Sequence, residues 1–529
     1  MTQTITISTA IAYPNAAPHL GHALEFIQAD ALARFYRLSG FDVMFTTGTD
    51  EHGTKIYKTA KEENMTPQEL VDRNVEYFKE MCDILGISND LFLRTTDEVL
   101  RRGAVKLWER LVAAGDLYKD TYEGLYCSGC ENYMLKKDLV DGKCPNHMKE
   151  PEVLKEENYF FRLSKYIPWL KEHIGGQLEV LGEFRVAEIK NMLDDLKDVS
   201  FSRPKSALPW GVTVPGDSDH VMYVWCDALA NYLTGLDFAG EGIDGVGADG
   251  VVCGENFKKY WPTTINIIGK DIMKFHAIFW PAMLKSAELP LPEKLYVHGF
   301  VTSEGKKMGK SLGNVVDPVE YAREFGADAL RYYLLSQIST QDDGDFARDR
   351  FLEVYQAHLA NNVGNLVSRV VAMVEKYRDG VINLNDGLYD EEASGFFEKE
   401  YVNNLFRSVF LQYNSDFENF DIKRASEAVL EIAHNMNEFI EAKKPWGLAK
   451  NGDDNDLNFV LFTLLEGIRV IGVLLQPIIP IKANEILDQL GIGLEDRNFD
   501  SIFDSQYKFL CRKRYKVEKG EPLFPRLEV

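Results

Sequence analysis

The sequence lacks a continuous apolar segment of about 18 residues, the shortest stretch that reads as a membrane-spanning helix. Its N-terminus carries neither the apolar core of a signal peptide nor an Arg-rich transit segment. Cysteine is scarce, with seven residues in 529, and the odd number does not suggest a framework of paired disulfides. These absences predict a cytoplasmic protein that keeps its thiols reduced and does not enter a membrane.

Basic residues are in deficit as well, because 59 Lys and Arg stand against 82 Asp and Glu, for a formal charge of −23. Proteins coated by nucleic acid depend on clustered Lys and Arg, so this balance taken alone argues against that class. A local basic groove on an acidic body remains compatible with it. The apolar share of 45% and charged share of 27% are those of a globular protein. A chain of 529 residues allows about three or four domains.

The N-terminal region alternates buried strands with an amphipathic helix. Residues 4–11 (TITISTAI) are β-branched and apolar, residues 21–38 have helical periodicity, and residues 41–47 again read as a strand. Strand, helix and strand in this order predict a βαβ unit, and therefore a parallel sheet. Further strands are expected only much later, at 264–268 and 295–300.

The segment between the two sets of strands has a different texture. Residues 115–200 are rich in Tyr, Glu and Lys and contain a cysteine cluster, which indicates an insertion that splits a nucleotide-binding domain. Beyond residue 318 the strand signals end and helical patterns follow, as in a helical bundle. The expected helices are 348–377, 403–417, 422–443 and 457–476.

The first motif that carries chemistry is PHLGH, residues 18–22, just past the first strand and at a helix N-terminus. In open α/β sheets nucleotides bind at this position, where backbone N–H groups and the helix dipole favour phosphate. His19 and His22 are three residues apart and share a helix face, and Gly21 allows close approach of a ligand. On this motif alone, a capping histidine beside a solvated one is an equally good explanation.

The second motif is KKMGKS, residues 306–311, which places Lys307 and Lys310 on either side of Gly309. A loop with two ammonium groups can close on a polyphosphate and hold the charge of a leaving group. A lone pair of lysines is more often a solvated surface loop. The pairing of HxGH after the first strand with KMxKS after the last one is far more specific.

With both signatures in place, the sequence resembles the class I aminoacyl-tRNA synthetases, and within them the methionyl branch. Other stretches carry the resemblance in the family's order: 48–53, 157–161, 223–229, 268–272, 275–276, 280–283, 298–300, 444–446 and 523–526. Two departures are visible. HLGH replaces HIGH, which is a neutral exchange, and Gly309 replaces the usual Ser, which gives that loop more conformational freedom.

The third motif is a pair of tight turns with the spacing Cys127-x2-Cys130-x13-Cys144-x2-His147. Three thiolates and one imidazole match a tetrahedral structural zinc site, with no open position for water. The alternative is a metal-free cluster of reduced thiols. We therefore expect one structural Zn²⁺ per chain, and the resemblance agrees, since many family members carry such a knuckle in the insertion.

The resemblance also implies ligand contacts that no pattern in the sequence would identify. Asp50 would hold the substrate ammonium, Lys270, Asp271 and Met308 would meet ATP together with the two signatures, and ATP would bring Mg²⁺. The implied methionine pocket consists of Ile11, Tyr13, Trp225, Ala228, Leu229, Tyr232, Phe275 and His276. An unbranched thioether suits such aromatic and aliphatic walls. Without the resemblance, Trp225 and Phe275 would be read as core.

Three residues of the helical region match the family's anticodon-reading positions. Asn365 and Arg369 are spaced i, i+4 on one helix face, and Trp446 follows Pro445 at a helix start. An exposed Trp beside Arg and Asn can stack on unpaired bases and read their edges. If the resemblance is ignored, helix packing or a satisfied helix end is the favoured explanation for each residue.

The resulting hypothesis is an α/β protein with a split Rossmann catalytic domain, a zinc-bearing insertion and an all-α anticodon-binding bundle. The expected domains are 1–114 and 223–317 for the two catalytic halves, 115–222 for the insertion, 318–350 for a connecting segment and 351–529 for the bundle. The implied activity is methionine–tRNA ligation: L-methionine is activated by ATP and transferred to tRNA(Met). The chain ends soon after the bundle, so we expect a monomer.

Three alternatives remain at this point. Synthetases for leucine, isoleucine or valine carry a large editing insertion, and the 285 residues that separate His22 from Lys307 are too few for one. A small nucleotidyltransferase with HxGH would need neither a bundle nor a zinc knuckle. A catalytically inactive tRNA-binding paralogue would not need to retain His19, His22, Asp50, Lys307 and Lys310.

Overall fold

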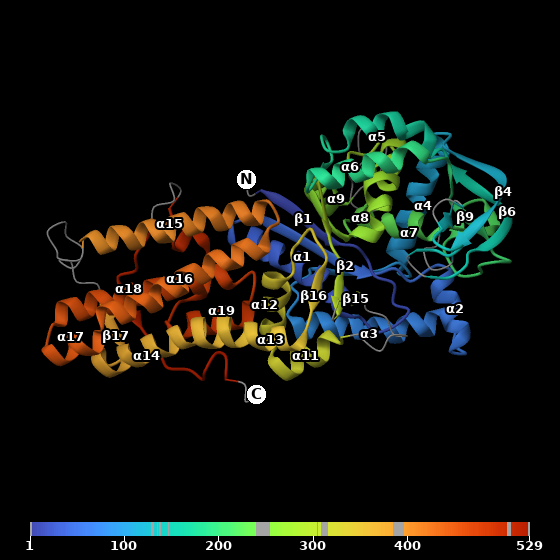
Figure 1. The fold of residues 1–529 in the computed structure, drawn as a ribbon. Helices are drawn as coiled ribbons and strands as arrows, with labels where there is room; N and C mark the ends of the chain where they lie inside the picture. The colour runs from blue at the N-terminus through green and yellow to red at the C-terminus, as the bar shows by residue number, and fades with distance from the viewer. Residues whose placement is uncertain are drawn as a thin grey trace.

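The fold has a sheet-bearing half and an elongated helical half, which lie at opposite ends of the molecule in Figure 1. This computed structural model describes residues 3–127, 132–134, 136, 139–145, 148–239, 254–303, 305–307, 316–383, 396–504 and 509–526. The mixed α/β architecture with a helical C-terminal region confirms the coarse fold that the sequence predicts.

The core of the sheet-bearing half is a six-stranded parallel sheet with the order β3-β2-β1-β12-β13-β7. Ile7 at its centre faces Phe45 on one neighbouring strand and Ile265 on the other. The predicted strands and the parallel pairing are confirmed. The strands are β1 (Thr4–Thr9), β2 (Asp42–Thr49), β3 (Leu91–Arg94), β7 (Glu179–Val180), β12 (Thr264–Gly269) and β13 (Lys294–His298).

Helix α1 (Leu20–Leu38) returns from β1 to β2 and packs its apolar side on the sheet. It ends where Gly40 adopts a positive φ of 83°, a conformation that suits glycine. Thr66 caps α3 and exchanges hydrogen bonds with Glu69, which is the capping box that its sequence encodes. The neighbouring helices are α2 (Thr54–Glu62), α3 (Pro67–Leu85) and α4 (Glu98–Ala113).

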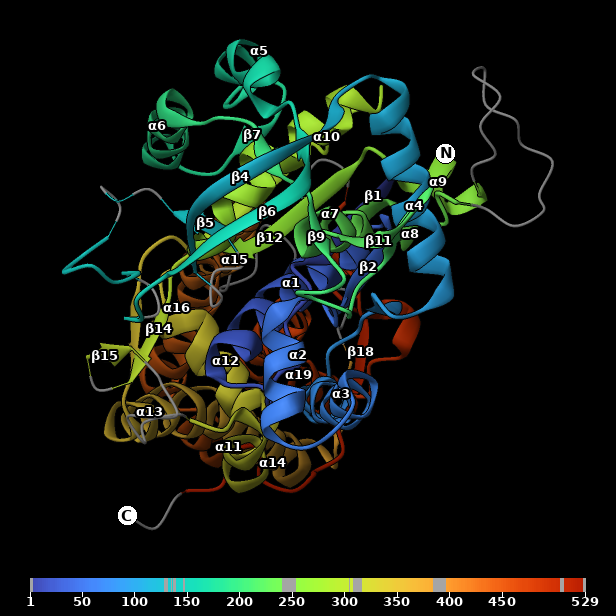
Figure 2. The same cartoon turned by 90° about the vertical axis from the view of Figure 1, so that its right-hand side faces the viewer.

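The insertion is built on a second, antiparallel sheet with the order β5-β4-β6-β8. Figures 1 and 2 show β4 and β6 side by side as a long ribbon, paired from Leu117↔Phe161 to Tyr126↔Glu152. Its elements are β4 (Leu117–Cys127), β5 (Asn132–Met134), β6 (Glu152–Phe161), η2 (Leu163–Tyr166), α5 (Ile167–His173), α6 (Glu183–Met192), η3 (Leu193–Asp195), β8 (Val199–Ser200), β9 (Ser202–Pro204), β10 (Thr213–Val214) and β11 (Asp217–Met222).

One short strand of the predicted insertion, β7, unexpectedly belongs to the central sheet. β7 pairs with β13 and forms the last strand of the central sheet, with Val180 opposite Leu295. Only two residues long, β7 is too short to show a strand period in the sequence. The region of the predicted insertion is thus tied to the sheet that it divides.

The chain then returns to the sheet through short helices and leaves it through a three-stranded sheet of order β15-β14-β16. Strand β16 overturns the expectation that strands end at residue 318, as do β17 and β18 further on. These strands have three residues each, too few for a periodic pattern. The elements are α7 (Val224–Leu229), α8 (Asn231–Thr234), α9 (Glu255–Tyr260), η4 (Lys270–Ile272), η5 (Phe275–Phe279), α10 (Trp280–Ser286), β14 (Val301–Ser303), β15 (Lys306–Lys307), α11 (Pro318–Phe325), α12 (Ala327–Gln337) and β16 (Gly344–Phe346).

The helices predicted for the helical half are confirmed, but one of them is interrupted. The element expected at 348–377 consists of α13, the π-helical segment η7 and α14, so that a wider turn lies in its middle. The elements are α13 (Arg348–Val354), η7 (Tyr355–Gly364), α14 (Asn365–Arg378), β17 (Val381–Asn383), α15 (Phe396–Glu418), α16 (Ile422–Lys443), α17 (Pro445–Asn451), α18 (Asp454–Leu475), α19 (Pro480–Gln489), η8 (Leu494–Asp496), η9 (Phe499–Ser501) and β18 (Arg514–Lys516).

Helix α18 forms the centre of this bundle. By length and composition it is the one described helix that could cross a membrane, but 94% of its most apolar stretch is buried inside the fold. The Glu466 and Arg469 side chains interrupt the apolar surface and pair with each other at 2.6 Å. Tyr515 donates to the same Glu466 carboxylate at 2.8 Å. The buried charges are thus compensated, as an apolar core requires.

A buried ion pair joins the two halves. Arg331 on α12 has no exposed side-chain surface and contacts Asp30 of α1 at 2.7 Å. Its guanidinium also donates to the carbonyls of Pro477 and Ile478, which precede α19, at 3.1 and 3.0 Å. Burial by itself raises the pKa of the Asp30 carboxyl, but Arg331 and Arg34 outweigh it and hold that pKa below its usual value. Helix α1, which begins with the histidine motif, is therefore fastened directly to the helical half.

Candidate active site

A cavity of about 450 Å³ opens at the carboxyl ends of β1 and β12. This is the edge of a parallel sheet at which α/β proteins bind ligands. Five segments meet there: the loop and first turns of α1, the loop after β2 with the start of α2, helix α7, the turn after β12 and the turn after β13. Its lining residues are Ala10, Ile11, Ala12, Tyr13, Asn15, Ala16, Ala17, His19, Gly21, His22, Glu25, Phe26, Asp50, Lys55, Trp225, Gly269, Asp271, Ile272, His298, Gly299, Phe300 and Val301.

The two signature histidines cap helix α1 with their Nδ1 atoms. The Gly21 amide donates to His19 Nδ1 at 3.1 Å, and the His19 amide donates to His22 Nδ1 at 3.2 Å. A ring nitrogen that accepts a hydrogen bond carries no proton, so each neutral ring keeps its proton on Nε2. The rings stack with centroids 3.9 Å apart. Capping thus leaves the Nε2–H of each histidine available to the cavity that both residues line, and the capping explanation is confirmed for His19.

Gly21 has a packing role that the sequence did not suggest. A Cβ at this position would lie 2.9 Å from Cε1 of His19 and 3.1 Å from its Nδ1. Any side chain would therefore displace the ring that caps the helix. The glycine makes room for His19, whatever further space it leaves for a ligand.

The His22 imidazole is held neutral by its surroundings. Burial lowers its pKa well below the usual value, and the nearby His19 and Lys55 add to the effect. A neutral ring fits the assignment of its proton to Nε2. His22 is therefore a hydrogen-bond donor in the cavity, and a permanent positive charge has to come from another group.

The loop after β2 presents Asp50 to the cavity and is braced by its neighbours. Asp50 is 2% exposed, and its amide donates to the Ala12 carbonyl at 2.8 Å. The next carboxylate, Glu51, accepts from Arg94 Nε and from Thr49 Oγ1, each at 2.7 Å. Arg94 lies on β3, so the loop is tied to two strands. The Asp50 carboxylate therefore belongs to a loop whose position is fixed by β1 and β3.

A second brace links this loop to helix α7. His52 pairs with Asp227, and both side chains are only 2% exposed. Trp210 lies against the His52 ring with centroids 5.4 Å apart and donates to the Glu51 carbonyl at 2.7 Å. Glu51, His52 and Asp227 were not singled out by the sequence analysis, although all three lie inside the stretches that carry the family resemblance.

The residues of the implied methionine pocket form two layers. Ile11, Tyr13, Asp50 and Trp225 line the cavity. The other five are buried behind this wall: Ala228, Leu229, Tyr232, Phe275 and His276. The Trp225 and Phe275 rings stack in parallel at 3.8 Å. Among the residues the structure describes, Trp225 is thus the aromatic surface of α7 that faces the cavity, with Phe275 as its support.

Tyr232 and His276 form a closed pair inside the second layer. His276 Nδ1 lies 3.0 Å from the Ile272 carbonyl and can only donate to it, so Nε2 accepts from the Tyr232 hydroxyl at 2.7 Å. Burial lowers the pKa of His276 to about 4, which keeps the ring neutral. In this arrangement both His276 nitrogens have protein partners. The contacts of His276 are thus with Tyr232 and the Ile272 carbonyl, behind the pocket that the family resemblance implies.

The opposite wall carries an ion pair that the sequence analysis missed. His298, at the end of β13, contacts Glu25 at 3.0 Å. Burial raises the pKa of Glu25 and by itself lowers that of His298, but the hydrogen bond to Glu25 leaves the pKa of His298 raised. Glu25 follows His22 by three residues and so shares its helix face. This spacing was the available signal.

The residues implied for ATP at the end of β12 are separated by the structure. Asp271 lines the cavity. Lys270 does not appear in that lining and binds Asp343 at 2.6 Å. Asp343 in turn accepts from the Phe300 amide at 2.8 Å. Lys270 thus ties the turn after β12 to the segment between α12 and β16.

The second signature lies at the limit of the described chain. Lys307 belongs to β15, where its backbone pairs with Thr302. Met308, Gly309 and Lys310 lie outside the described residues. The expected contacts of this loop therefore remain predictions.

Two of the four expected zinc ligands are described. Cys127 ends β4 and Cys144 opens a tight turn, in which the Met148 amide donates to its carbonyl at 2.7 Å. Both thiols are buried. Cys130 and His147 lie outside the described residues. Within the part of the chain that is described, no cluster of three candidate ligands occurs.

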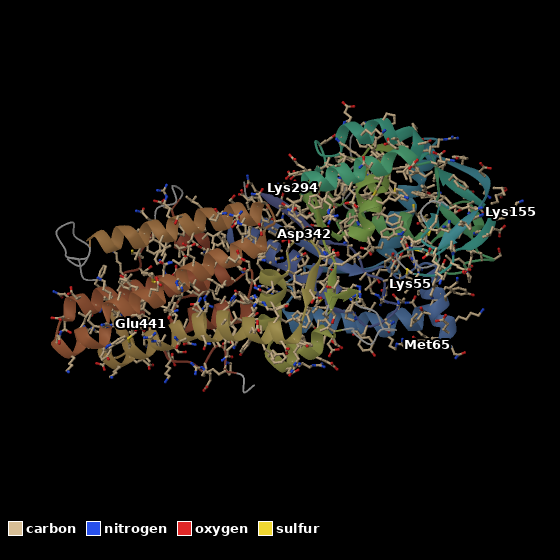
Figure 3. The ribbon with its side chains drawn as sticks, viewed as in Figure 1. Lys55, Met65, Lys155, Lys294, Asp342 and Glu441 are labelled. Atoms are coloured by element: carbon tan, nitrogen blue, oxygen red, sulfur yellow. The ribbon has the colours of Figure 1, made fainter. Side chains whose placement is uncertain are left out.

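The three expected anticodon residues come from neighbouring helices. Asn365 and Arg369 lie on the first turns of α14, and Arg369 pairs with Glu441 of α16 at 2.7 Å. Trp446 is the second residue of α17, which follows α16 closely, and is 43% exposed. Figure 1 places α17 at the end of the helical half furthest from the sheet, and Figure 3 labels Glu441 in the same half.

Two family models match successive parts of the chain, in the order that the sequence predicts. The model described as "tRNA synthetases class I (M)" matches residues 5–151 and 146–371. The model described as "Anticodon binding domain of methionyl tRNA ligase" matches residues 390–524. Together they cover the sheet-bearing half and most of the bundle.

Similar proteins agree with the family models. A methionine–tRNA ligase of Caldanaerobacter subterraneus is 40% identical over all of this chain and 80% of its own length. That of Rickettsia felis is 37% identical over 100% and 99% of the two chains. A solved structure of the Mycobacterium tuberculosis methionyl-tRNA synthetase with methionyl-adenylate superposes with a TM-score of 0.91. It is 36% identical and covers 99% of this chain and 100% of its own.

Proposed function

We propose how individual side chains of this protein work, given that the chain belongs to the class I aminoacyl-tRNA synthetases, in the branch of the methionine–tRNA ligases. Its function is that of a methionine–tRNA ligase. The observation that supports the residue-level proposal is the cavity, whose wall combines the Asp50 carboxylate with two histidines and the aromatic surface of Trp225.

The first step is the activation of methionine by Mg²⁺-bound ATP. Asp50 binds the ammonium group, while Trp225, backed by Phe275, covers the thioether side chain together with Ile11 and Tyr13. The Nε2–H groups of His19 and His22 donate to the α-phosphate as its charge grows. Asp271 contacts the nucleotide, and Lys307 and Lys310 hold the departing pyrophosphate. Catalysis is positioning and charge stabilisation, without a side-chain nucleophile.

The second step transfers the methionyl group to the terminal ribose of tRNA(Met). The location of Trp446 far from the cavity supports a division of labour, in which α14, α16 and α17 read the anticodon. We further propose that the protein acts as a cytoplasmic monomer. The proposed domain boundaries are 114, 222, 317 and 350, with β7 as a strand contributed by the insertion to the catalytic sheet.

The test of this function is ATP–pyrophosphate exchange with different amino acids. Exchange is expected with methionine and to be negligible with leucine or isoleucine, because a flat wall of stacked Trp225 and Phe275 suits an unbranched side chain. One methylene in an apolar pocket changes specificity only about 10- to 200-fold, so the comparison is made on kcat/KM. Equal exchange with leucine would contradict the assignment, and no exchange with any amino acid would favour an inactive paralogue.

For the metal, we propose that Cys127, Cys130, Cys144 and His147 bind one structural Zn²⁺. Burial of Cys127 and Cys144 on turns at the end of β4 and after β5 supports the donor set. One zinc per chain is expected in the purified protein by elemental analysis. The Cys127→Ser/Cys130→Ser variant should lose that zinc, with Cys82→Ser as a matched control that keeps it. A variant that is metal-free, equally stable and fully active would show that these four residues do not form a structural zinc site.

For the anticodon, replacing Trp446 by Ala is expected to lower aminoacylation about tenfold to a hundredfold at limiting tRNA, because stacking of one base on an aromatic ring contributes about 1–3 kcal/mol. Exchange without tRNA should not change. The matched control is Leu411→Ala, which removes a similarly exposed side chain from α15, at 41% against 43% for Trp446. The decisive comparison uses tRNA(Met) and a tRNA with an altered anticodon. If the preference between them stays the same in Trp446→Ala, then Trp446 does not read the anticodon.

A further inference from the structure

The charge of the cavity wall does not match the substrates that the proposed function requires. Besides the Glu25–His298 pair, its lining contains the carboxylates of Asp50 and Asp271, while the substrates bring a triphosphate and a carboxylate. Among the described lining residues, Lys55 is the only lysine or arginine. Since His22 is held neutral, Lys55 is the described group that can bring a permanent positive charge to bound anions.

The fold directs Lys55 to the place where the two substrates must meet. Lys55 is the second residue of α2. This helix follows the braced loop that contains Asp50, which lies five residues earlier in the chain. The ammonium nitrogen of Lys55 lies 5.4 Å from the centre of the Tyr13 ring. It is also close enough to His22 to lower the pKa of that ring. Figure 3 labels Lys55 where α2 begins, below the ribbon of β4 and β6.

These neighbours identify the substrate atoms beside Lys55. Asp50 marks the methionine ammonium, and the methionine carboxylate is attached to the same carbon. His22 marks the α-phosphate. Lys55 lines the same cavity as Asp50 and is near His22, so we expect its ammonium group beside the reacting pair, the attacking carboxylate and the α-phosphoryl group.

We propose that Lys55 is a further catalytic residue of the activation step, which contacts the α-phosphoryl anion during adenylate formation. The inference rests on the proposed function. In that step a carboxylate oxygen forms a bond to the α-phosphorus, the bond to the β-phosphate oxygen breaks, and pyrophosphate leaves with the electron pair. Lys55 stays protonated and transfers no proton. It offsets the mutual repulsion of two anions as they approach, a contribution that grows towards the transition state.

A purely structural role predicts different behaviour. If Lys55 only packs on Tyr13 and shapes the wall, its replacement by Met retains most of that packing and affects charged and neutral ligands alike. If it contacts the phosphoryl anion, only charged ligands lose affinity. The two roles are therefore separated by a pair of ligands that differ in one charge.

The experiment compares Lys55→Met with Lys55→Arg and with Lys58→Met. Lys58 lies one turn further along α2, outside the lining, and is 46% exposed in an ion pair with Glu152. Methionine-dependent exchange by Lys55→Met is expected to have a kcat about a hundredfold lower, with the KM for methionine changed less than about threefold. Lys55→Arg should recover part of the loss, and Lys58→Met should behave as the unmodified protein.

The binding arm uses methioninyl-adenylate, which keeps the phosphodiester anion, and an analogue with a neutral sulfone in its place. Lys55→Met should bind the anionic ligand at least about tenfold more weakly and the neutral ligand as before. Equal weakening of both ligands, or exchange at the normal rate, would overturn the proposal. If the unmodified protein shows no methionine-dependent exchange, the proposed function itself fails, which is a separate outcome.

Discussion

Replacement of His22 by Asn is expected to lower the kcat of methionine-dependent exchange about a hundredfold or more without unfolding the protein. The His22 Nδ1 accepts from the His19 amide at 3.2 Å, and the side-chain oxygen of Asn can occupy the same position. The cap of α1 is thereby kept, while the Nε2–H donor is lost. Loss of one donor to developing charge in comparable sites costs about 10²–10³ in rate.

Two further variants separate the cap from the chemistry. His22→Gln extends an amide N–H towards the position of Nε2 and should recover part of the activity. His22→Ala should lose both activity and helix stability, because it removes the cap as well. His434→Asn, at an exposed position of α16, serves as the matched control. Normal exchange by His22→Asn would mean that the histidine only caps the helix.

Replacement of Arg331 by Met is expected to reduce the free energy of unfolding by about 3–5 kcal/mol, measured from the urea dependence of circular dichroism. The variant leaves the fully buried Asp30 carboxylate without its main counter-charge and removes donors from the carbonyls of Pro477 and Ile478. Because the junction fastens α1 to the bundle, the transitions of the two halves should also separate.

Two further variants test whether charge or packing at Arg331 stabilises the junction. Arg350→Met removes an exposed partner of Glu353, with side chains 56% and 67% exposed, and should cost less than about 1 kcal/mol. Adding Asp30→Asn to Arg331→Met should restore part of the lost stability, because the uncompensated charge disappears. A double variant that is less stable than Arg331→Met alone would show that lost packing, and not charge, dominates.

The pH dependence of the unmodified junction follows from the lowered pKa of Asp30. A carboxyl whose pKa is lower in the folded than in the unfolded chain stabilises the fold above its unfolded value and loses that contribution as the pH falls through the folded one. Since this pKa lies below its usual 3.8, the ion pair persists at every pH at which exchange is assayed. Changes in the activity of the unmodified protein across that pH range therefore do not arise from titration of Asp30.

Patterns within one segment of the sequence were sufficient to predict the features that depend on that segment alone. The β-branched run of β1, the periodicity of α1 and the limits of α16 follow from patterns that each segment carries alone. The histidine signature works in the same way, because a capping pair is made by residues three apart. Short strands such as β7 and β16 have too few residues for a pattern, and their pairing depends on a distant partner.

The sequence by itself determined the parallel order of the first strands, the family and the two histidines at the start of α1. Only the tertiary structure decided which charged groups meet, because those contacts join residues far apart in the chain. Glu25 meets His298, His52 meets Asp227, and Lys270 turns to Asp343. A sequence pattern shows which residues share one face of a helix or strand. The net charge of a site and the protonation of its side chains depend on which residues folding places opposite that face. The role proposed for Lys55 likewise depends on the tertiary structure, because folding places it in one cavity wall with Asp50, Tyr13 and His22.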